Sequence, residues 1–138
     1  MTAYIDSSVL LRIILRASGL LSEWTSIERF IGSAIVRVEC FRALHRLRTT
    51  EPFSDEQFAR HSEIAERTLL RLELISVTDA ILERAAGPLS SPLKTLDAIH
   101  LATASLWRER EDASISLATH DEQFALAARM MGFVVLGV

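Results

Sequence analysis

Short apolar runs and longer amphipathic stretches alternate along the whole chain. Short runs rich in Val, Ile and Leu are typical of strands buried in a sheet, whereas apolar side chains spaced three or four residues apart indicate helices. The pattern predicts strands at residues 2–5, 33–35, 72–77, 114–118 and 133–136. It predicts helices at residues 9–15, 22–31, 36–48, 54–70, 78–86, 96–108 and 121–131.

Cap and turn residues support several of these boundaries. Ser54 is followed three residues later by Gln57, the pattern of a capping box at a helix start. Gly87 and Pro88 form a standard stop signal after the helix at 78–86, and Gly132 closes the last helix. These signals make the order of elements more secure than periodicity alone would.

Strands separated by helical segments predict an α/β fold, with a central parallel sheet of four to five strands covered by helices on both faces. The chain has 138 residues, the usual size of one domain, and contains no repeat, low-complexity tract or linker. We therefore expect a single domain over residues 1–138. Sheets of this kind place their functional sites at the carboxyl ends of the strands.

The composition agrees with a globular domain, because 49% of the residues are hydrophobic and 24% are charged. Cys40 is the only cysteine, which excludes an internal disulfide and fits a reducing cytoplasm, the location we expect. The N-terminal residues lack the pattern of a signal peptide. Arg12 and Arg16 interrupt the longest apolar stretch, so no membrane span is expected.

The net charge of −3 argues against a generally basic surface for nucleic acid. However, Lys94 is the only lysine, and the guanidinium groups of the arginines suit phosphate well. Carboxylates that hold a divalent metal also reverse the local charge. Five arginines could flank a phosphate-binding groove, although a solvated helix face is the simpler interpretation of each: Arg12, Arg16, Arg42, Arg46 and Arg48.

Four carboxylates stand at positions where acids are unusual. Asp6 directly follows the first predicted strand, and Asp121 follows the strand at 114–118. Glu39 lies within the apolar stripe of its helix, and Asp97 lies in a helix with little polar surface nearby. Carboxylates are rarely buried unless they are paired or bind a metal, so Asp97 is the hardest of the four to explain as a structural residue.

Each acid also has a simpler interpretation. Asp6 and Asp121 could cap the helices that follow them, and Glu39 could reach solvent beside Arg42 or Arg46. The combination is more informative than any one acid. If all four converge, two unit charges about 4 Å apart repel by about 4 kcal/mol at an effective dielectric near 20. Only protons or cations offset such repulsion.

Carboxylate oxygens favour hard cations, Mg²⁺ or Mn²⁺. Such ions polarise a phosphodiester, lower the pKa of a bound water and stabilise the leaving oxygen. The four acids therefore predict a metal-dependent site for phosphodiester hydrolysis, on the condition that the fold brings them together.

Four short segments contain these acids: Tyr-Ile-Asp-Ser-Ser at 4–8, Val-Arg-Val-Glu at 36–39, Leu-Asp-Ala-Ile-His-Leu-Ala at 96–102 and Thr-His-Asp at 119–121. In order and spacing they resemble the acidic motifs of PIN-domain ribonucleases, above all VapC-type toxins of bacterial toxin–antitoxin pairs. The resemblance covers essentially the whole chain. The segment at 96–102 is the most distinctive of the four.

The resemblance implies a PIN-like α/β/α sandwich and a Mg²⁺-dependent endoribonuclease, with Mn²⁺ able to substitute. In such an enzyme Asp6 and Asp97 would be the principal metal ligands. Glu39 and Asp121 would complete the acidic pocket, as ligands or through bound water. Members are usually homodimers that cleave RNA, and a cognate antitoxin protein inhibits them.

Other polar residues lie close to the four acids. The resemblance implies that Ser7 and Thr119 orient the carboxylates by hydrogen bonding. His100 could shuttle protons, but a packed or hydrogen-bonded structural histidine is the favoured interpretation. His120 is expected to be exposed, and Cys40 is expected to be a buried, inert thiol.

Two alternatives to a ribonuclease stay open. A phosphatase of the haloacid type needs a second Asp where this chain has Ser8, and a receiver domain needs a late lysine, whereas Lys94 precedes Asp97. A degenerate PIN domain could bind RNA or protein without cleaving either. The intact set of acids argues against this last alternative.

Overall fold

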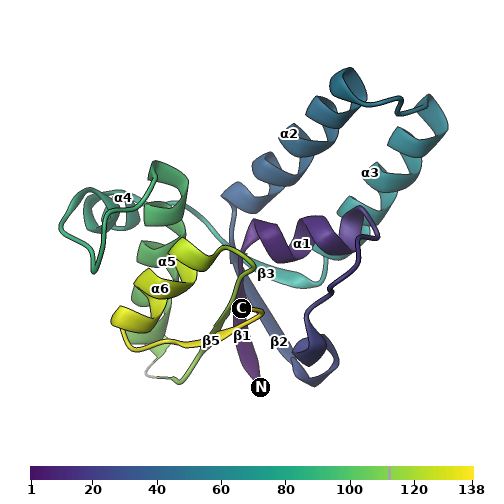
Figure 1. Ribbon diagram of the computed structural model, residues 1–138. Coiled ribbons are helices and arrows are strands. Elements are labelled where there is room, and N and C mark those ends of the chain that lie inside the picture. Colours follow the sequence, from purple (N-terminus) through teal and green to yellow (C-terminus); the bar gives the residue numbers. More distant parts are fainter. Residues whose placement is uncertain (112) are drawn as a thin grey trace.

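Five parallel strands form the centre of the structure, and helices cover both faces of the sheet (Figure 1). The computed structural model describes residues 1–111 and 113–138. The strands are β1 (Thr2–Ile5), β2 (Arg29–Ser33), β3 (Leu72–Ile75), β4 (Ser116–Ala118) and β5 (Val134–Leu136). The helices are α1 (Ser7–Ile14), α2 (Ile35–Thr50), α3 (Asp55–Leu69), α4 (Asp79–Ala86), α5 (Thr95–Glu111) and α6 (Glu122–Met130), with a 3₁₀ turn, η1 (Ser22–Ser26). The predicted α/β fold is confirmed.

Successive side chains of β1 point to opposite faces of the sheet and enter two different cores. Ala3 and Ile5 pack in a cluster that also contains residues of α1, α2 and α3. Tyr4 packs in a second cluster, with residues of α5 and α6. A strand covered on both faces carries apolar residues without alternation, which explains the unbroken apolar run at the start of the chain.

The strand order β3-β2-β1-β4-β5 means that the chain changes direction across the sheet at β1. From β1 it proceeds outward to β2 and β3 by way of α1, α2 and α3, and it returns to the other side of β1 by way of α4 and α5. The carboxyl ends of β1 and β4 therefore form the topological switch point, where open α/β sheets place their sites.

Helices α2 and α3 form a hairpin that extends beyond the sheet (Figure 1). The predicted capping box is confirmed at its turn: the Ser54 hydroxyl accepts from the Gln57 amide at 3.1 Å, and the Gln57 side chain accepts from the Ser54 amide at 2.9 Å. Farther along, Arg37 on α2 donates two hydrogen bonds, of 2.7 and 2.8 Å, to Glu66 on α3. These contacts fix the hairpin whose first helix carries Glu39.

The helix predicted at residues 22–31 is wrong. Residues 22–26 form the 3₁₀ turn η1, and β2 follows, so the strand predicted at 33–35 is displaced as well. Ile27 and Phe30 do belong to one core cluster, with Trp24 packed against it, but a turn and a strand bring them there instead of a helix. Pairing of β2 with both β1 and β3 decides the conformation, because strand formation depends on neighbouring strands more than on intrinsic preference.

The remaining predicted elements are present, with ends shifted by at most three residues. Thr78 caps α4 through its hydroxyl, and α4 ends before Gly87, as its stop signal indicates. Within residues 1–111 and 113–138, none of the helices combines the length and apolar character that a membrane crossing requires.

Candidate functional site

The carboxyl ends of β1 and β4 bring together residues that lie more than a hundred positions apart in the sequence. Asp6 directly follows β1, and its backbone amide donates to the carbonyl of Ala118, the last residue of β4, at 3.0 Å. Thr119 follows β4 at the same edge of the sheet and is fully buried. The side chains of Asp6 and Thr119 consequently meet at the topological switch point.

Asp6 is surrounded by hydrogen-bond donors and is only 5% exposed. One of its carboxylate oxygens accepts from the Ser7 amide at 2.8 Å. The other accepts from the hydroxyls of Ser8, at 2.6 Å, and Thr119, at 2.8 Å. Asp6 therefore caps α1, as its simpler interpretation requires, while its orientation is fixed at the edge where the site was predicted. Capping and a place in the site are compatible.

Glu39, near the start of α2, is held at both carboxylate oxygens. Oε1 accepts from the Ser7 hydroxyl at 3.1 Å. Oε2 accepts from His100 Nε2 on α5 at 2.8 Å. The side chain thus points toward the sheet edge instead of pairing with Arg42 or Arg46, which form no ion pair among the described residues.

His100 is fully buried, and its ring lies close to both Asp6 and Glu39. Its Nε2 is 3.7 Å from an oxygen of Asp6, in addition to the bond to Glu39. Its Nδ1 is hydrogen-bonded to the Tyr4 hydroxyl at 2.8 Å. Burial lowers the pKa of His100, but the hydrogen bond to Glu39 and the charges of the nearby acids outweigh burial and raise it. The histidine is packed and hydrogen-bonded, the favoured interpretation.

Asp97 lies in the first turn of α5 and is half-buried. Among the described residues no donor forms a hydrogen bond with its carboxylate. Burial raises the pKa of Asp97, and the charges of Asp6, Asp121 and Glu39 raise it further, while His100 lowers it. The charges of the other three predicted acids therefore act on Asp97, and each of those three accepts a hydrogen bond from another described residue.

Asp121 is more exposed than the other three and caps α6. Its Oδ1 accepts from the Phe124 amide at 2.8 Å, and its own amide donates to the Thr119 hydroxyl at 3.0 Å. Thr119 is thus shared: it donates to Asp6 and accepts from the backbone of Asp121. This threonine fixes two of the acids relative to each other.

No three His, Cys, Asp or Glu side chains within residues 1–111 and 113–138 are grouped closely enough to hold a metal ion together. This does not conflict with a site for Mg²⁺, because that ion keeps several waters and is commonly bound through only one or two carboxylates. The donor set consists of carboxylates, and none of the described residues donates a hydrogen bond to Asp97, although His100 lowers its pKa. The residues present fit a hard divalent cation of this kind.

Two residues of the site were not predicted. Ser8 donates to Asp6 and accepts from the His120 amide at 2.9 Å, so it links both strand ends. Tyr4 supports His100 from inside the core. The position of Ser8, two residues after an acid at a helix start, is a local signal that could have identified it. Tyr4 gave no such signal, because its partner lies on a helix distant in the sequence.

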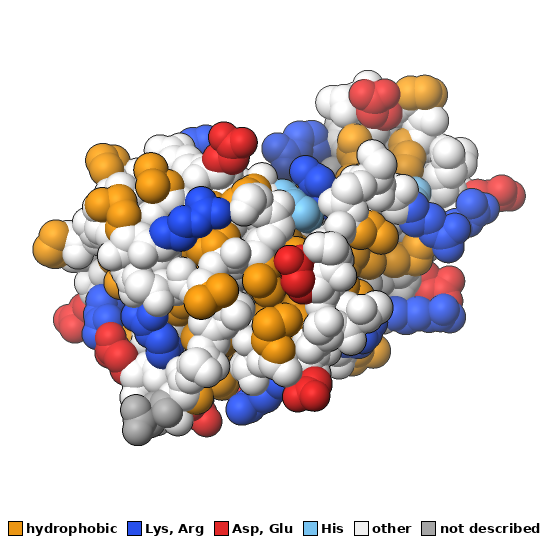
Figure 2. All heavy atoms as spheres, turned by 60° about the horizontal axis from the view of Figure 1, so that its bottom comes forward, with side chains coloured by type: hydrophobic (Ala, Val, Ile, Leu, Met, Phe, Trp, Pro, Cys, Tyr) orange, Lys and Arg blue, Asp and Glu red, His pale blue; other side chains and the backbone are white. Residues whose placement is uncertain are grey.

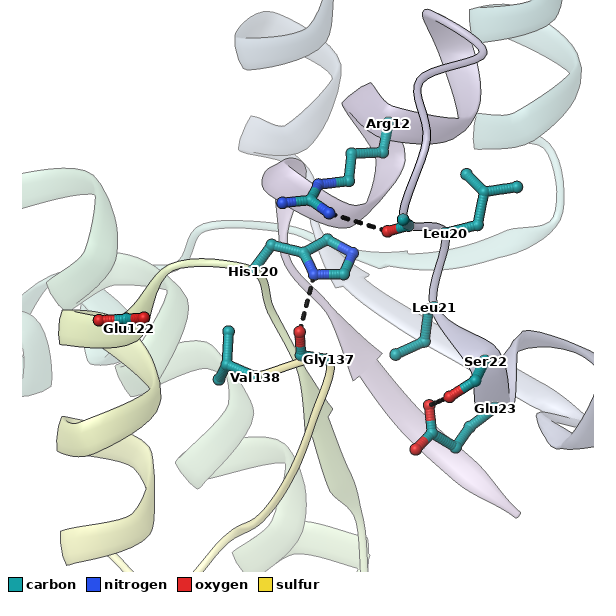
Figure 3. Close-up of a pocket in the computed structure, with 10 residues that line it drawn as sticks. Arg12, Leu20, Leu21, Ser22, Glu23, His120, Glu122, Gly137 and Val138 are labelled. Carbon is teal, nitrogen blue, oxygen red and sulfur yellow. Dashed lines mark hydrogen bonds between the residues drawn. The ribbon is translucent and has the colours of Figure 1, made fainter.

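His120 is half-buried instead of exposed. Its Nδ1 is hydrogen-bonded to the Gly137 carbonyl at 2.9 Å, and because a carbonyl only accepts, Nδ1 carries the hydrogen (Figure 3). The ring lines a hollow of about 570 Å³ together with Arg12 and Glu23 (Figure 3). Arg12 is fixed there by donating to the Gly19 carbonyl at 2.8 Å. None of the four predicted acids lines this hollow.

Cys40 is buried, next to Glu39 in the chain. Burial raises the pKa of its thiol to about 12, and the charges of Glu39 and Asp6 contribute to the increase. Because only the thiolate is a good nucleophile or metal ligand, we expect Cys40 to be inert, in line with the sequence prediction.

The arginines predicted near the site have different surroundings. Arg42 and Arg46 line a mostly apolar hollow of about 350 Å³ that also borders Glu39. Arg48 is paired with Asp55 instead. On the face that Figure 2 draws, Lys and Arg side chains lie in separate groups interspersed with acids, and this agrees with the net charge of −3.

Comparisons with known proteins agree with this geometry. Residues 3–130 match the PIN domain family. The chain is 31% identical over 141 aligned positions to Ribonuclease VapC46 of Mycobacterium tuberculosis (strain H37Rv), covering 96% of this chain and 95% of that protein. Nucleases with a PIN domain generally use a divalent metal.

A solved structure shows the same fold. A chain in the crystal structure of VapBC2 from Rickettsia felis bound to a DNA fragment from their promoter matches with a TM-score of 0.64, over 98% of this chain and 97% of that chain, at 15% sequence identity. The family match and the relative both extend over most of the sequence. This chain therefore belongs to the PIN domain family and is of the VapC type.

Proposed function

We propose that this chain is a metal-dependent endoribonuclease that hydrolyses RNA phosphodiester bonds, and that it is the toxin of a toxin–antitoxin pair. The observation that carries the proposal is the state of Asp97. This half-buried carboxylate has no hydrogen-bond donor among the described residues, and its pKa is raised first by burial and then by the charges of three further acids. A group in this position needs a proton or a cation, and an oxygen-only donor set selects a hard divalent ion.

Asp6 and Asp97 would hold the ion, and Glu39 and Asp121 would contribute directly or through water. A Mg²⁺ ion, or Mn²⁺ in its place, supplies Lewis-acid polarisation of the phosphate and a bound water of lowered pKa. Asp6 enters this role already oriented, because Ser8 and Thr119 hold one of its oxygens by hydrogen bonds of 2.6 and 2.8 Å.

The proposal includes partners. The name of the ribonuclease relative supports RNA as the substrate, and the VapBC2 complex supports a cognate antitoxin. We also propose that residues 1–138 act as a single domain in the cytoplasm and associate as a homodimer. The single domain is supported by the two core clusters, which pack against opposite faces of one sheet.

The proposal is tested by cleavage of a labelled single-stranded RNA by wild type, Asp6→Asn and Asp97→Asn. Glu28→Gln is the control, because this exposed carboxylate pairs with the Met1 amino group at the opposite, amino-terminal end of β1. We expect wild type and Glu28→Gln to cleave with Mg²⁺ or Mn²⁺ and to stop in EDTA. Both Asp variants are expected to lose more activity than the roughly 10- to 100-fold that removing a residue supporting a metal ligand costs, while circular dichroism stays native.

Cleavage that persists in EDTA, or in both Asp variants, contradicts the proposal. Binding of the RNA with no cleavage under any metal condition contradicts it too, and indicates a degenerate domain that only binds.

A further inference from the structure

A buried tyrosine and a buried histidine connect the interior of the domain to one acid of the site. Tyr4 on β1 and His100 on α5 are both 0% exposed, and the Tyr4 hydroxyl lies 2.8 Å from His100 Nδ1. The two rings meet edge to face, with centroids 5.9 Å apart. The opposite ring nitrogen, Nε2, lies 2.8 Å from Oε2 of Glu39. Both nitrogens of this histidine are therefore engaged.

The direction of the hydrogen bond to Glu39 follows from the groups themselves. A carboxylate only accepts, so Nε2 must carry a hydrogen and donate it to Glu39. If the ring is neutral, Nδ1 accepts from Tyr4; if it is charged, Nδ1 donates to the Tyr4 oxygen. The Nε2–H group faces Glu39 in both cases, so its action on the carboxylate does not depend on the charge of the ring.

The contact joins the two layers of the molecule. His100 belongs to α5, which packs on the face of the sheet that Tyr4 enters. Glu39 belongs to α2, whose Cys40 and Leu44 pack on the other face. Two hydrogen bonds determine where Glu39 points beyond the carboxyl edge of the sheet. His100 donates to its Oε2, and the Ser7 hydroxyl donates to its Oε1.

Without His100, Glu39 would have another partner available. Arg42 is exposed on the same helix, three residues later, and side chains at that spacing are neighbours on a helix surface. Glu39 would then turn along α2 toward solvent and away from Asp6. A leucine at position 100 could fill the space in the core, but it could not donate to Glu39.

We propose that His100, oriented by Tyr4, is a positioning residue that holds the Glu39 carboxylate at the metal site. The proposal rests on the proposed function, because it assumes that the four acids bind a divalent ion. It gives the histidine of the distinctive segment at 96–102 a role in site geometry that is separate from core packing.

The first experiment measures Mn²⁺ affinity of the full chain without RNA, by calorimetry or by electron paramagnetic resonance of free Mn²⁺. His100→Leu should weaken binding by about 10- to 100-fold, the usual loss when a residue that orients a metal ligand is removed. His100→Gln, which keeps an N–H donor near the position of Nε2, should recover most of the affinity. Tyr4→Phe should have a smaller effect, because Nε2–H still reaches Glu39.

A control separates positioning from general destabilisation. Ile31→Val removes one methylene group from the core cluster that contains Tyr4 and should cost about 0.5–1.5 kcal/mol of stability without changing Mn²⁺ affinity. Equal affinity losses in Ile31→Val and His100→Leu would overturn the proposal. Failure of His100→Gln to bind better than His100→Leu would also overturn it.

A double-mutant cycle tests whether His100 acts through Glu39. In a Glu39→Gln background, His100→Leu should reduce Mn²⁺ affinity little further, whereas a full additional loss contradicts the proposed route. Asp6→Asn and Asp97→Asn distinguish the two proposals. If these variants lose Mn²⁺ binding but His100→Leu does not, only the positioning role is wrong; if they keep it, the metal site itself is wrong.

Discussion

Asp6 and Asp97 lie at one site but in opposite kinds of surroundings. Asp6 is almost completely buried and accepts from two hydroxyls and a backbone amide at 2.6 to 2.8 Å. Asp97 is half-buried, has no hydrogen-bond donor among the described residues, and has a pKa raised by burial and by the charges of neighbouring acids. The protein thus satisfies one carboxylate and leaves the other unsatisfied.

The two kinds of surroundings suit two different requirements of a metal site. A carboxylate fixed by several donors keeps its position whether or not an ion is bound. A carboxylate that faces like charges and has no hydrogen-bond donors is stabilised most by a bound cation. The cation offsets both the repulsion and the loss of solvation. At the proposed metal site, Asp6 would therefore provide preorganisation, and Asp97 would provide the driving force for binding.

The largest expected difference is in the stability of the metal-free protein. Asp6→Ala removes the cap of α1, which costs about 1 kcal/mol, and leaves the hydroxyls of Ser8 and Thr119 without their acceptor. We expect a total loss of about 2–4 kcal/mol in the free energy of unfolding. Asp97→Asn should instead increase stability, since it removes a charge that the fold disfavours.

Urea denaturation in EDTA measures both changes. The first turn of α5 favours an acid by about 0.3–1 kcal/mol through the helix dipole, which works against the gain from Asp97→Asn. Burial and the charges of the neighbouring acids raise the pKa of Asp97 and act against this benefit, so we expect a net gain in stability. A loss of stability in Asp97→Asn as large as that in Asp6→Ala would end the distinction between the two residues.

The next expected effect is stabilisation by metal. At a Mn²⁺ concentration about 100 times its Kd, binding to the folded state alone raises the free energy of unfolding by about 2.7 kcal/mol. Asp97→Asn should lose most of this increase, because it removes the group whose charge the ion offsets. Glu28→Gln should keep it. An increase of equal size in Asp97→Asn and wild type would show that Asp97 does not bind the ion.

Much of this comparison was accessible from the sequence. Asp6 directly follows a short apolar strand, and Asp97 interrupts an apolar helix, so each stands out by position alone. Parallel sheets align the carboxyl ends of their strands, which predicts that Asp6 and Asp121 meet even though their separation in sequence is large. Local signals and one rule of topology were sufficient to single out these acids, and their role in binding a metal stays a prediction.

The supporting contacts were not accessible in this way. The bond between Tyr4 and His100 depends on which residues of β1 and α5 face each other, and no local pattern fixes that register. The same limitation explains the wrong helix at 22–31: Phe30 and Ile31 form a strand because β1 and β3 lie on either side of them. Contacts decided by packing of distant segments require the folded structure.

The smallest expected effect is on the dependence of stability on pH. Glu66, which accepts two hydrogen bonds from Arg37 on the surface, has a pKa lowered first by that bonding. Its contribution to stability is present above the unfolded pKa of about 4.3 and is lost as pH falls through the lower native value. Glu66→Gln should therefore be slightly less stable than wild type at neutral pH and equal to it in acid.

The contribution of Asp97 to stability should change with pH in the opposite direction. Its native pKa lies above the unfolded value of about 3.9, so the folded state binds the proton more tightly and wild type loses stability as pH rises through this interval. The gain in stability of Asp97→Asn over wild type should be absent near pH 4 and should reach its full size above the native pKa of Asp97. Thermal unfolding in EDTA between about pH 4 and pH 7.5 measures it. If the curves of Asp97→Asn and Glu66→Gln diverge from wild type in the same direction, Asp97 is stabilised by its neighbours, and the reason for a cation at this site is removed.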